Sequence, residues 1–538
     1  MKLIQYGTTK DWSEHGYECP KYDRDILKQK TAAEPTWVHF GAGNIFRAFP
    51  AAVLERLLNE GSYDRGIVVC EGFDTEIIDK AYLPYDSLSL LVVLKADGSI
   101  EKRVIGSVTE AIKADYAAKA DWERLSGIFR QSSLQMISFT ITEKGYVVTD
   151  SEGNALPLVQ KDIEENALRP VHIMGKLAAL LYERFRGTGA PIAMVSMDNC
   201  SHNGDRLKAG VLYYAEKWLE KGLVPVDFIK YLRDTSRVSF PWSMIDKITP
   251  RPDETVRAML QKDGFEDSDL IITSKNTYTA PFVNAEETEY LVIEDSFPNG
   301  RPPLELGGLY FTDRKTVDKV ETMKVCTCLN PLHTSLAVFG CLLSYEKICD
   351  EMKDELLRTL VTRMAYEEAM PVVVDPGIIS PEEFLEAVLK QRLPNPFMPD
   401  APARIATDTS QKIPIRFGGT LKAYLAKNKP LEELTLIPLV LAGYGRYLLG
   451  INDGGEVFTP SPDPRLSELM SVMEGIKLGQ TGIPEEALRT LYTDKDIFGI
   501  DLYEAGLKQK IEQMFMEMIK EPGAIRNTLK KYVVSQLA

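Results

Sequence analysis

The chain has 538 residues, of which 44% are hydrophobic and 26% are charged, so it has enough apolar material for more than one buried core. Its 63 Lys and Arg residues against 78 Asp and Glu residues give a net charge of −15, which argues against nucleic acid or an anionic membrane as the main partner. No apolar run approaches the roughly 20 residues that span a bilayer, and the N-terminal segment lacks the order of a secretory signal, so we expect a cytoplasmic protein.

The first half of the chain reads as an alternation of strands and helices. Residues 36–46 run from a short apolar strand into a Gly-x-Gly turn, and the apolar spacing over 46–61 is that of an amphipathic helix. A β-branched run at 66–70 completes a βαβ unit. Later elements continue the pattern: a hairpin over 88–106 with its turn at Asp97-Gly98, strands at 135–142 and 191–197, and a helix over 174–187. We therefore predict an α/β, Rossmann-like dinucleotide-binding domain.

Helical patterns dominate from about residue 332 onward. Ser380 and Glu383 form a capping box around a first-turn proline, and residues 502–521 are another long amphipathic segment. The proline-rich stretch 297–308 is the best candidate for the junction between the two halves. We predict the dinucleotide-binding domain over residues 1–305 and a mostly α-helical C-terminal domain over 306–538.

The Gly41-x-Gly43 turn after the first strand is the start of a dinucleotide-binding fingerprint, in which backbone N–H groups approach a pyrophosphate at a helix N-terminus. Phe46 stands where the full fingerprint has a third glycine, so a purely structural turn is an equal alternative. Glu71, at the end of the second strand, is placed to accept from ribose hydroxyls. A carboxylate there favours NAD over NADP, because its repulsion of a 2′-phosphate reaches about 4 kcal/mol; the alternative is a solvated loop acid.

Two polar clusters follow apolar runs and are candidates for chemistry. The strand at 191–197 delivers four polar residues at its C-terminal end, where α/β sheets place their ligands: Asp198, Asn199, His202 and Asn203. The second cluster, Lys324, Asn330 and His333, leads into an apolar helix. A lysine near apolar surface can act as a base, and asparagine amides can donate to a developing oxyanion. A helix-capping asparagine and a packed histidine explain the second cluster equally well.

Metal chemistry has little support in the sequence. The chain has five histidines and no His-x-x-x-His pair, and Cys326-x-Cys328 lacks the second cysteine pair of a zinc site. Seven cysteines are an odd number in a long chain, which predicts reduced thiols. Tyr213-x-x-x-Lys217 has the spacing of short-chain dehydrogenases, but that spacing arises by chance on many helices. We predict no metal site.

Several motifs along the chain resemble the polyol-specific long-chain dehydrogenases, the mannitol dehydrogenase family that includes fructuronate and tagaturonate reductases. The similar stretches are HFGAGNIFRA at 39–48, TEKGY at 142–146, SMDNCSHNG at 196–204, FPWSMIDKITP at 240–250, VIEDSFPNGRPP at 292–303 and, further on, GRYLLGINDGGE, SPDP and DIFGIDL. Because these matches are spread over most of the chain, the resemblance covers both predicted domains.

The resemblance assigns roles to individual residues. It implies Lys324 as the catalytic base, Asn199 and Asn330 as oxyanion-holding amides, and His333 as a substrate contact. The remaining assignments are the substrate-binding residues Asp246, Arg446 and His202 and the cofactor-binding residues Gly41, Gly43, Asn44, Phe46, Arg47, Glu71 and Glu143. Two positions depart from the family pattern: five residues rather than four separate Lys324 from Asn330, and Trp242 replaces an asparagine. The extra residue indicates a bulge or a shifted lysine.

The resemblance implies a zinc-independent, NAD-dependent oxidoreductase that interconverts a secondary alcohol of a linear polyol or sugar acid with the ketone. Within the family we favour D-mannonate and D-fructuronate, with mannitol 2-dehydrogenase or tagaturonate reductase as alternatives and a non-catalytic NAD-binding regulator as a remote one. The predicted partner is a small polyol or keto-sugar acid, with no nucleic acid and no membrane, and the oligomeric state is open. A carboxylate-bearing substrate needs a local cation, for which Lys247, Arg251 and Arg446 are candidates.

Overall fold

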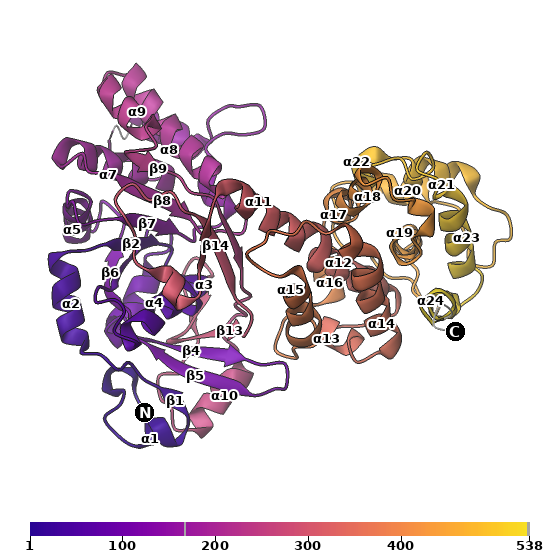
Figure 1. Cartoon of the computed structure of the whole chain (residues 1–538), viewed down its shortest axis with the longest axis horizontal. Coiled ribbons are helices and arrows are strands. Elements are labelled where there is room, and N and C mark those ends of the chain that lie inside the picture. Colours follow the sequence, from indigo (N-terminus) through magenta and orange to yellow (C-terminus); the bar gives the residue numbers. More distant parts are fainter. Residues whose placement is uncertain (166–167, 535–538) are drawn as a thin grey trace. The chain divides into compact units, whose positions relative to one another are not determined.

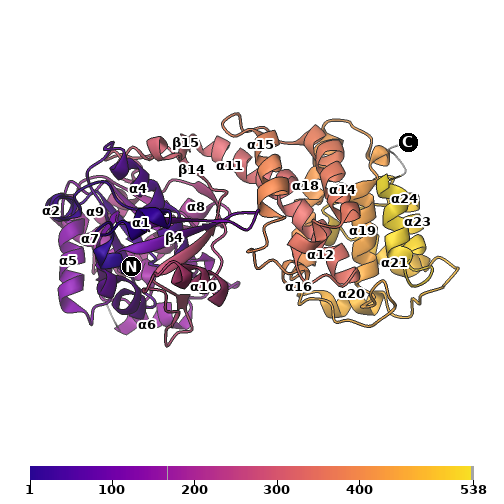
Figure 2. The same ribbon diagram turned by 90° about the horizontal axis from the view of Figure 1, so that it is seen from below.

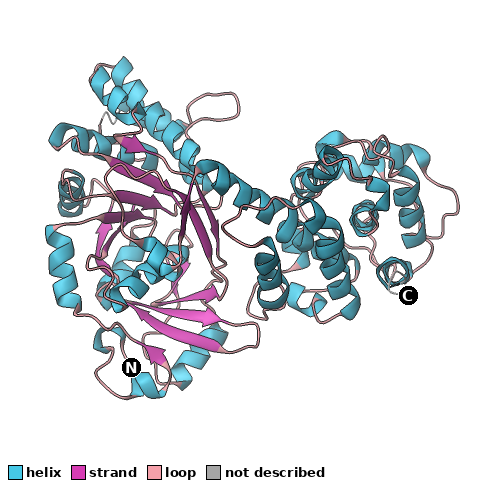
Figure 3. Ribbon diagram, viewed as in Figure 1, coloured by secondary structure: helices cyan, strands magenta, loops and turns pink. Residues whose placement is uncertain are grey.

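The computed structural model describes residues 1–165 and 168–534, and the chain divides into two compact units. Unit 1 consists of residues 1–95 and 99–318, and unit 2 of residues 96–98 and 319–538. The strands belong to unit 1, whereas the described part of unit 2 is built from helices (Figure 3). An α/β N-terminal part followed by a mostly helical C-terminal part is what the sequence predicts.

The chain passes from unit 1 to unit 2 inside a helix, α11 (Arg314–Met323), rather than at the proline-rich stretch. That stretch is fixed to unit 1, because Arg56 donates from Nε (3.1 Å) and Nη2 (2.7 Å) to the carbonyl of Gly307. The unit boundary therefore falls after Asp318, beyond the predicted 305/306 junction.

A six-stranded parallel sheet forms the centre of unit 1 (Figure 1). Across the sheet the strands are β6 (Val108–Lys113), β3 (Ile67–Glu71), β2 (Trp37–Phe40), β7 (Met136–Phe139), β8 (Ile192–Ser196) and β9 (Val238–Ser239). Numbered by their succession within this sheet, they run 3-2-1-4-5-6, the order of a dinucleotide-binding Rossmann fold. Ligands of such sheets bind at the carboxyl ends of the strands, which directs attention to the loops after β2, β3, β7 and β8.

Helices cover both faces of this sheet. Its strands alternate between two cores: Val38 and Phe40 pack with Leu125 and Leu177, whereas Trp37 packs with Leu57 on the opposite face. The helices before α11 are α1 (Asp11–Glu14), α2 (Arg24–Ala33), α3 (Asn44–Ala48), α4 (Pro50–Asn59), α5 (Lys119–Phe129), α6 (Pro157–Glu165), α7 (Ile173–Gly187), α8 (Asn203–Glu220), α9 (Val226–Arg233) and α10 (Glu254–Lys262). The helix predicted over 46–61 is broken at Phe49, because Pro50 disfavours helical backbone at the residue before it.

Three smaller sheets complete unit 1. A four-stranded sheet has the order β1 (Tyr17–Glu18), β5 (Ile100–Ile105), β4 (Ser89–Leu94), β13 (Phe282–Glu286), and β4 and β5 form the predicted hairpin. A three-stranded sheet has the order β10 (Ser243–Asp246), β14 (Tyr290–Glu294), β15 (Tyr310–Thr312). The short strands β11 (Ile271–Ile272) and β12 (Tyr278–Thr279) pair with each other.

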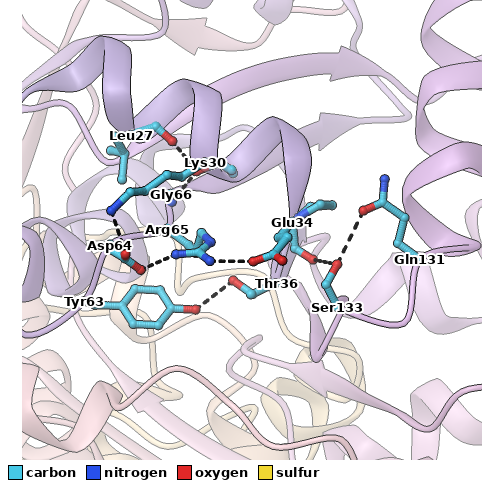
Figure 4. Close-up of polar contacts among 12 residues, drawn as sticks. Leu27, Lys30, Glu34, Thr36, Tyr63, Asp64, Arg65, Gly66, Gln131 and Ser133 are labelled. Carbon is cyan, nitrogen blue, oxygen red and sulfur yellow. Dashed lines mark hydrogen bonds and ion pairs between the residues drawn. The ribbon is translucent and has the colours of Figure 1, made fainter.

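The loops at the starting ends of β2 and β3 are held by a polar network (Figure 4). Asp64 pairs with Lys30 (2.8 Å) and with Arg65, and Arg65 also reaches Glu34 (2.6 Å). The hydroxyl of Tyr63 donates to Thr36 Oγ1 at 2.8 Å. These charged residues lie at the amino ends of β2 and β3 and hold the loops that precede the two strands. The candidate site lies at the opposite, carboxyl ends of the strands.

Unit 2 is a helical assembly around the apolar helix α12 (Asn330–Leu342), which packs against α19 (Leu436–Tyr447) (Figure 2). Its other helices are α13 (Ile348–Glu351), α14 (Glu355–Arg363), α15 (Pro381–Ala387), α16 (Pro402–Ile405), α17 (Thr409–Arg416), α18 (Gly418–Ala426), α20 (Leu466–Val472), α21 (Glu485–Tyr492), α22 (Lys495–Phe498), α23 (Lys508–Met518) and α24 (Ala524–Val534). The predicted cap is present, since Ser380 accepts from the N–H of Glu383 at 3.2 Å.

One helical stretch, 314–342, is long and apolar enough by length and composition to cross a membrane. Of its most apolar window, 72% is buried inside the protein. A core helix of a folded domain has this property, because its apolar residues are covered on all sides.

Candidate active site

The glycine turn after β2 has a backbone that only glycine adopts without strain. Gly41 has φ +107°, and a Cβ atom there would lie 2.2 Å from the carbonyl oxygen of Thr140. A Cβ on Gly43 would meet nothing within 4 Å, so open space lies above the turn. Because α3 starts at Asn44, its first N–H groups point into this space without partners within the helix. These features fit the pyrophosphate of a dinucleotide.

Glu71 ends β3 beside this turn, and backbone N–H groups hold its carboxylate. It accepts from Ala42 (2.9 Å) with one oxygen and from Phe73 (2.8 Å) and Asp74 (3.0 Å) with the other. An ionised carboxylate offers about four lone-pair sites, so three fixed bonds leave room for a ribose hydroxyl.

Phe46 lies beneath the turn and is fully buried. Its ring stacks on His39, with centroids 4.1 Å apart. His39 also hydrogen-bonds Ser138 (2.6 Å) and Thr140 (2.9 Å), and burial lowers its pKa to about 3, which keeps the ring neutral. Phe46 therefore supports the turn through packing instead of facing a ligand, which explains why the third glycine is not required here.

Arg47 is also buried. It donates to the carbonyl of Ala280 (2.6 Å), to Thr279 Oγ1 (2.7 Å) and to Asn44 Oδ1 (2.8 Å). These bonds tie α3 to the segment between β12 and β13. They favour a structural role for Arg47 over the predicted contact with the cofactor, which leaves Gly41, Gly43, Asn44 and Glu71 as the residues of this turn that would hold NAD.

The carboxyl ends of β7 and β8 are joined by Asp198. Its carboxylate accepts from the N–H groups of Ile141 and Thr142, both at 2.9 Å, and from the hydroxyl of Tyr146. Burial raises the pKa of Asp198 despite these bonds. The motifs at 142–146 and 196–204 thus meet at one edge of the sheet, as expected for adjacent parallel strands.

Three of the predicted residues at this edge are exposed. Asn199 follows Asp198 in the loop before α8, and His202 comes next with a left-handed backbone, φ 52°. Glu143 pairs with Arg206 at 2.6 Å on the surface. Asn203, by contrast, is buried and donates to the carbonyls of Asp198 and Ser243, both at 3.0 Å, so it fixes the loop rather than contacting a ligand.

Trp242, one of the two positions that depart from the family pattern, packs against His202 and Arg314. The ring of His202 lies parallel to it at 4.1 Å, and the guanidinium carbon of Arg314 lies 4.8 Å from its ring centre. His202 Nε2 is also 3.6 Å from Asp318. Asp246 is buried at the end of β10, opposite Tyr290. His202 is thus positioned by an aromatic surface that an asparagine would not provide.

In unit 2, Lys324 is buried, with 4% of its surface exposed, and begins a π-helical turn over Lys324–Cys328. The N–H of Leu329 donates to the carbonyl of Lys324 at 3.1 Å, a bond that spans five residues. Thr420 donates to the carbonyl of Cys326 at 2.7 Å and so supports the wide turn. The extra residue before Asn330 is therefore accommodated as a bulge, one of the two outcomes indicated by the sequence.

Asn330 and His333 lie one turn apart at the start of α12. Nε2 of His333 is 3.2 Å from Oδ2 of Asp400, and Asp400 also pairs with Arg404. Burial alone would raise the pKa of Asp400, but His333 and Arg404 together hold it below its usual value. Asp400 therefore stays ionised and orients the imidazole.

Two further cations lie near this pair on α17, which packs against α12 and the π-turn. Lys412 donates to the carbonyls of Ile405 and Thr407. Arg416 donates to the hydroxyl of Thr334, the residue after His333, at 2.6 Å. The side chains at 400, 404, 412 and 416 were missed by sequence reasoning, since only the i, i+4 spacing of Lys412 and Arg416 marks a shared helix face.

The cations proposed from sequence have other partners. Lys247 is buried in an ion pair with Glu289 at 3.0 Å, and Arg251 lies over the ring of Tyr278 at 4.5 Å. Arg446 is buried and donates to the carbonyls of Met518 (3.3 Å), Ile451 (2.6 Å) and Asn452 (3.2 Å). This geometry favours a structural role for Arg446 over a substrate contact.

Within residues 1–165 and 168–534, no three His, Cys, Asp or Glu side chains are grouped closely enough to hold a metal ion. The Cys326-x-Cys328 pair has separate surroundings: Cys328 reaches the carbonyl of Pro381 at 3.7 Å, and Cys326 lies beside Gly419. Burial raises the pKa of both thiols, to about 11 for Cys326 and about 12 for Cys328.

Comparison with known proteins matches both halves of the chain. The model of the mannitol dehydrogenase Rossmann domain matches residues 35–306, and that of the mannitol dehydrogenase C-terminal domain matches residues 316–519. D-mannonate oxidoreductase of Thermotoga maritima is 53% identical over 525 residues, which are 97% of each chain. Polyol:NADP oxidoreductase of Gluconobacter oxydans is 28% identical and covers 94% of this chain and 96% of its own.

A solved structure of D-sorbitol dehydrogenase in substrate-free form has the same fold, with a TM-score of 0.78 at 24% identity, covering 95% of this chain and 97% of its own. The chain therefore belongs to the mannitol dehydrogenase family and, as the sequence predicts, is an NAD-dependent oxidoreductase.

Proposed function

We propose that the protein is a D-mannonate oxidoreductase, which interconverts D-mannonate and D-fructuronate with NAD. The observation that carries this proposal is the 53% identity with D-mannonate oxidoreductase of Thermotoga maritima over 97% of both chains. The cations around His333 support it, because a sugar acid needs a positive group that a neutral polyol does not.

NAD held at the glycine turn would supply the hydride acceptor for the carbon that carries the reacting hydroxyl. Lys324 accepts the hydroxyl proton at Nζ, and in the reverse direction it donates that proton to the ketone oxygen. The amides of Asn199 and Asn330 donate to this oxygen as negative charge develops on it, a contribution typically worth a few kcal/mol for one donor. His333, oriented by Asp400, holds a neighbouring hydroxyl.

NAD is favoured over NADP because Glu71 stands beside the glycine turn. The three backbone N–H groups that bind its carboxylate keep the negative charge in place, where it accepts from the ribose 2′-hydroxyl and repels a 2′-phosphate. We also propose that no metal takes part and that the protein works in the cytoplasm, where its cysteine thiols stay reduced.

A steady-state assay of the purified protein with NADH tests the proposal, with D-fructuronate, D-tagaturonate and D-fructose as alternative substrates. We expect the highest kcat/KM with D-fructuronate. A higher value with D-tagaturonate or D-fructose would assign the protein to one of those reactions instead. Absence of turnover with all three, in a folded protein that binds NADH, would identify a non-catalytic regulator.

A further inference from the structure

Arg416 differs from the other cations near His333 in having no acidic partner. Arg404 pairs with Asp400, and Lys412 is bound by two carbonyls. The guanidinium of Arg416 donates only to the neutral hydroxyl of Thr334, and within the described ranges no carboxylate lies within 4.0 Å of it.

Burial of this unpaired guanidinium has an energetic cost. Desolvation lowers the pKa of Arg416 to about 10, and no nearby acid opposes that effect. A largely buried cation without a partner is unfavourable, and proteins compensate such charges with an ion pair or a ligand. The side chain nevertheless keeps some exposed surface, so a small anion can reach it.

The position of Arg416 connects it to the catalytic residues. It ends α17, which packs against both α12 and the π-turn of Lys324. Its bond to Thr334 places the guanidinium next to the residue that follows His333.

We propose that Arg416 binds the carboxylate of the substrate and thereby selects a sugar acid over the corresponding neutral polyol. This inference rests on the proposed function. The planar guanidinium can bind a carboxylate through two parallel hydrogen bonds, which a lysine cannot reproduce. A bound polyol would leave the same guanidinium buried and unpaired. The site therefore disfavours the neutral polyol in addition to favouring the sugar acid.

The test compares D-mannonate with D-mannitol as substrates for oxidation by NAD. For Arg416→Met we expect the KM for D-mannonate to rise about 100-fold, as for removal of one partner of a desolvated charge pair. Its kcat/KM with D-mannitol should stay the same or rise. The KM of Arg416→Lys for D-mannonate should lie between those of Arg416→Met and the wild type. The matched control is Lys427→Met, which removes one positive charge from an exposed position of unit 2.

A readout independent of turnover is the rise in melting temperature on adding D-mannonate, which should be present in the wild type and the control and absent in Arg416→Met. An Arg416→Met enzyme with an unchanged KM for D-mannonate would overturn the inference and leave the proposed function intact. Equal losses of kcat/KM for D-mannonate and D-mannitol in Arg416→Met would also overturn the inference. Removal of an arginine with a merely structural role would lower the activity with both substrates. A wild type that turns over D-fructose but not D-fructuronate would overturn both proposals.

Discussion

At the scale of single residues, the proposed chemistry makes Lys324 the general base. It is buried at the start of the π-turn, six residues before Asn330 in the chain. Lys324→Ala should lower kcat by about 10²–10⁴-fold, the usual contribution of a general base, without unfolding the protein.

The measurement is kcat for the wild type and Lys324→Ala, with the exposed Lys315→Ala as control. External amines should restore part of the lost activity. If Lys324→Ala keeps more than about a tenth of the wild-type kcat, far from the loss typical of a missing base, another residue is the base. His333→Ala is then the next variant to measure.

The second prediction at the residue scale is that Glu71 sets the choice of cofactor. The wild type should have a higher kcat/KM with NADH than with NADPH, because the carboxylate lies where a 2′-phosphate would bind. Glu71→Gln removes the charge but keeps the size, so the NADH-to-NADPH ratio should fall by at least about tenfold, the equivalent of 1.4 kcal/mol. Kinetics with both cofactors check this, and a wild type that prefers NADPH would contradict the assignment.

At the scale of elements, α13 places a glutamate against α12. Glu351 is fully buried, and neither carboxylate oxygen has a hydrogen-bond partner among the described residues. One oxygen lies so close to Gly340 that a Cβ there would be 2.3 Å from it. Burial, reinforced by Asp354, raises the pKa of Glu351 to about 10, so the folded protein carries it as the neutral acid.

This glutamate makes stability depend on pH. The unfolded chain loses the proton near the ordinary glutamate pKa of about 4.3, whereas the folded chain keeps it to about 10, so stability falls as pH rises between these values. Glu351→Gln should be as stable as the wild type near pH 4 and more stable at pH 8, by about 2 kcal/mol or more.

Thermal unfolding at both pH values checks this, with the exposed Glu346→Gln as control. A variant that is less stable than the wild type at pH 8 would show that the buried group is charged and paired.

At the scale of the whole molecule, we expect the proposed chemistry to need no metal. Prolonged treatment with a chelator should leave kcat and the melting temperature unchanged. The sparse histidines and the separate surroundings of Cys326 and Cys328 are the reason for this expectation. Loss of activity that added zinc restores would show the metal-free mechanism to be wrong.

Much of the fold follows from local sequence patterns. The βαβ unit around Gly41, the hairpin at Asp97-Gly98 and the cap at Ser380 were predictable, because apolar periodicity, turn residues and capping residues act within a few positions. The break at Phe49 was also predictable from Pro50, which disfavours helical backbone at the residue before it, although the apolar spacing alone indicates one continuous helix. The late start of α23 at Lys508 was not predictable from the apolar spacing. The same holds for the unit boundary, which lies inside a helix that has no composition signal.

The sequence by itself determined the family, because its motifs are spread along the whole chain. The cofactor turn and the candidate base stay predictions of the same contiguous motifs. Only the tertiary structure decided which charged side chains are bound to other parts of the protein and which lie near the candidate base. Lys247 is bound by the carboxylate of Glu289, 42 residues away in the chain, and Arg446 by carbonyls that include that of Met518, 72 residues away. Asp400 and Arg416 come next to His333 and Thr334 through helix packing. A charge acts through its neighbours in space, and the packing of separate elements creates those neighbours.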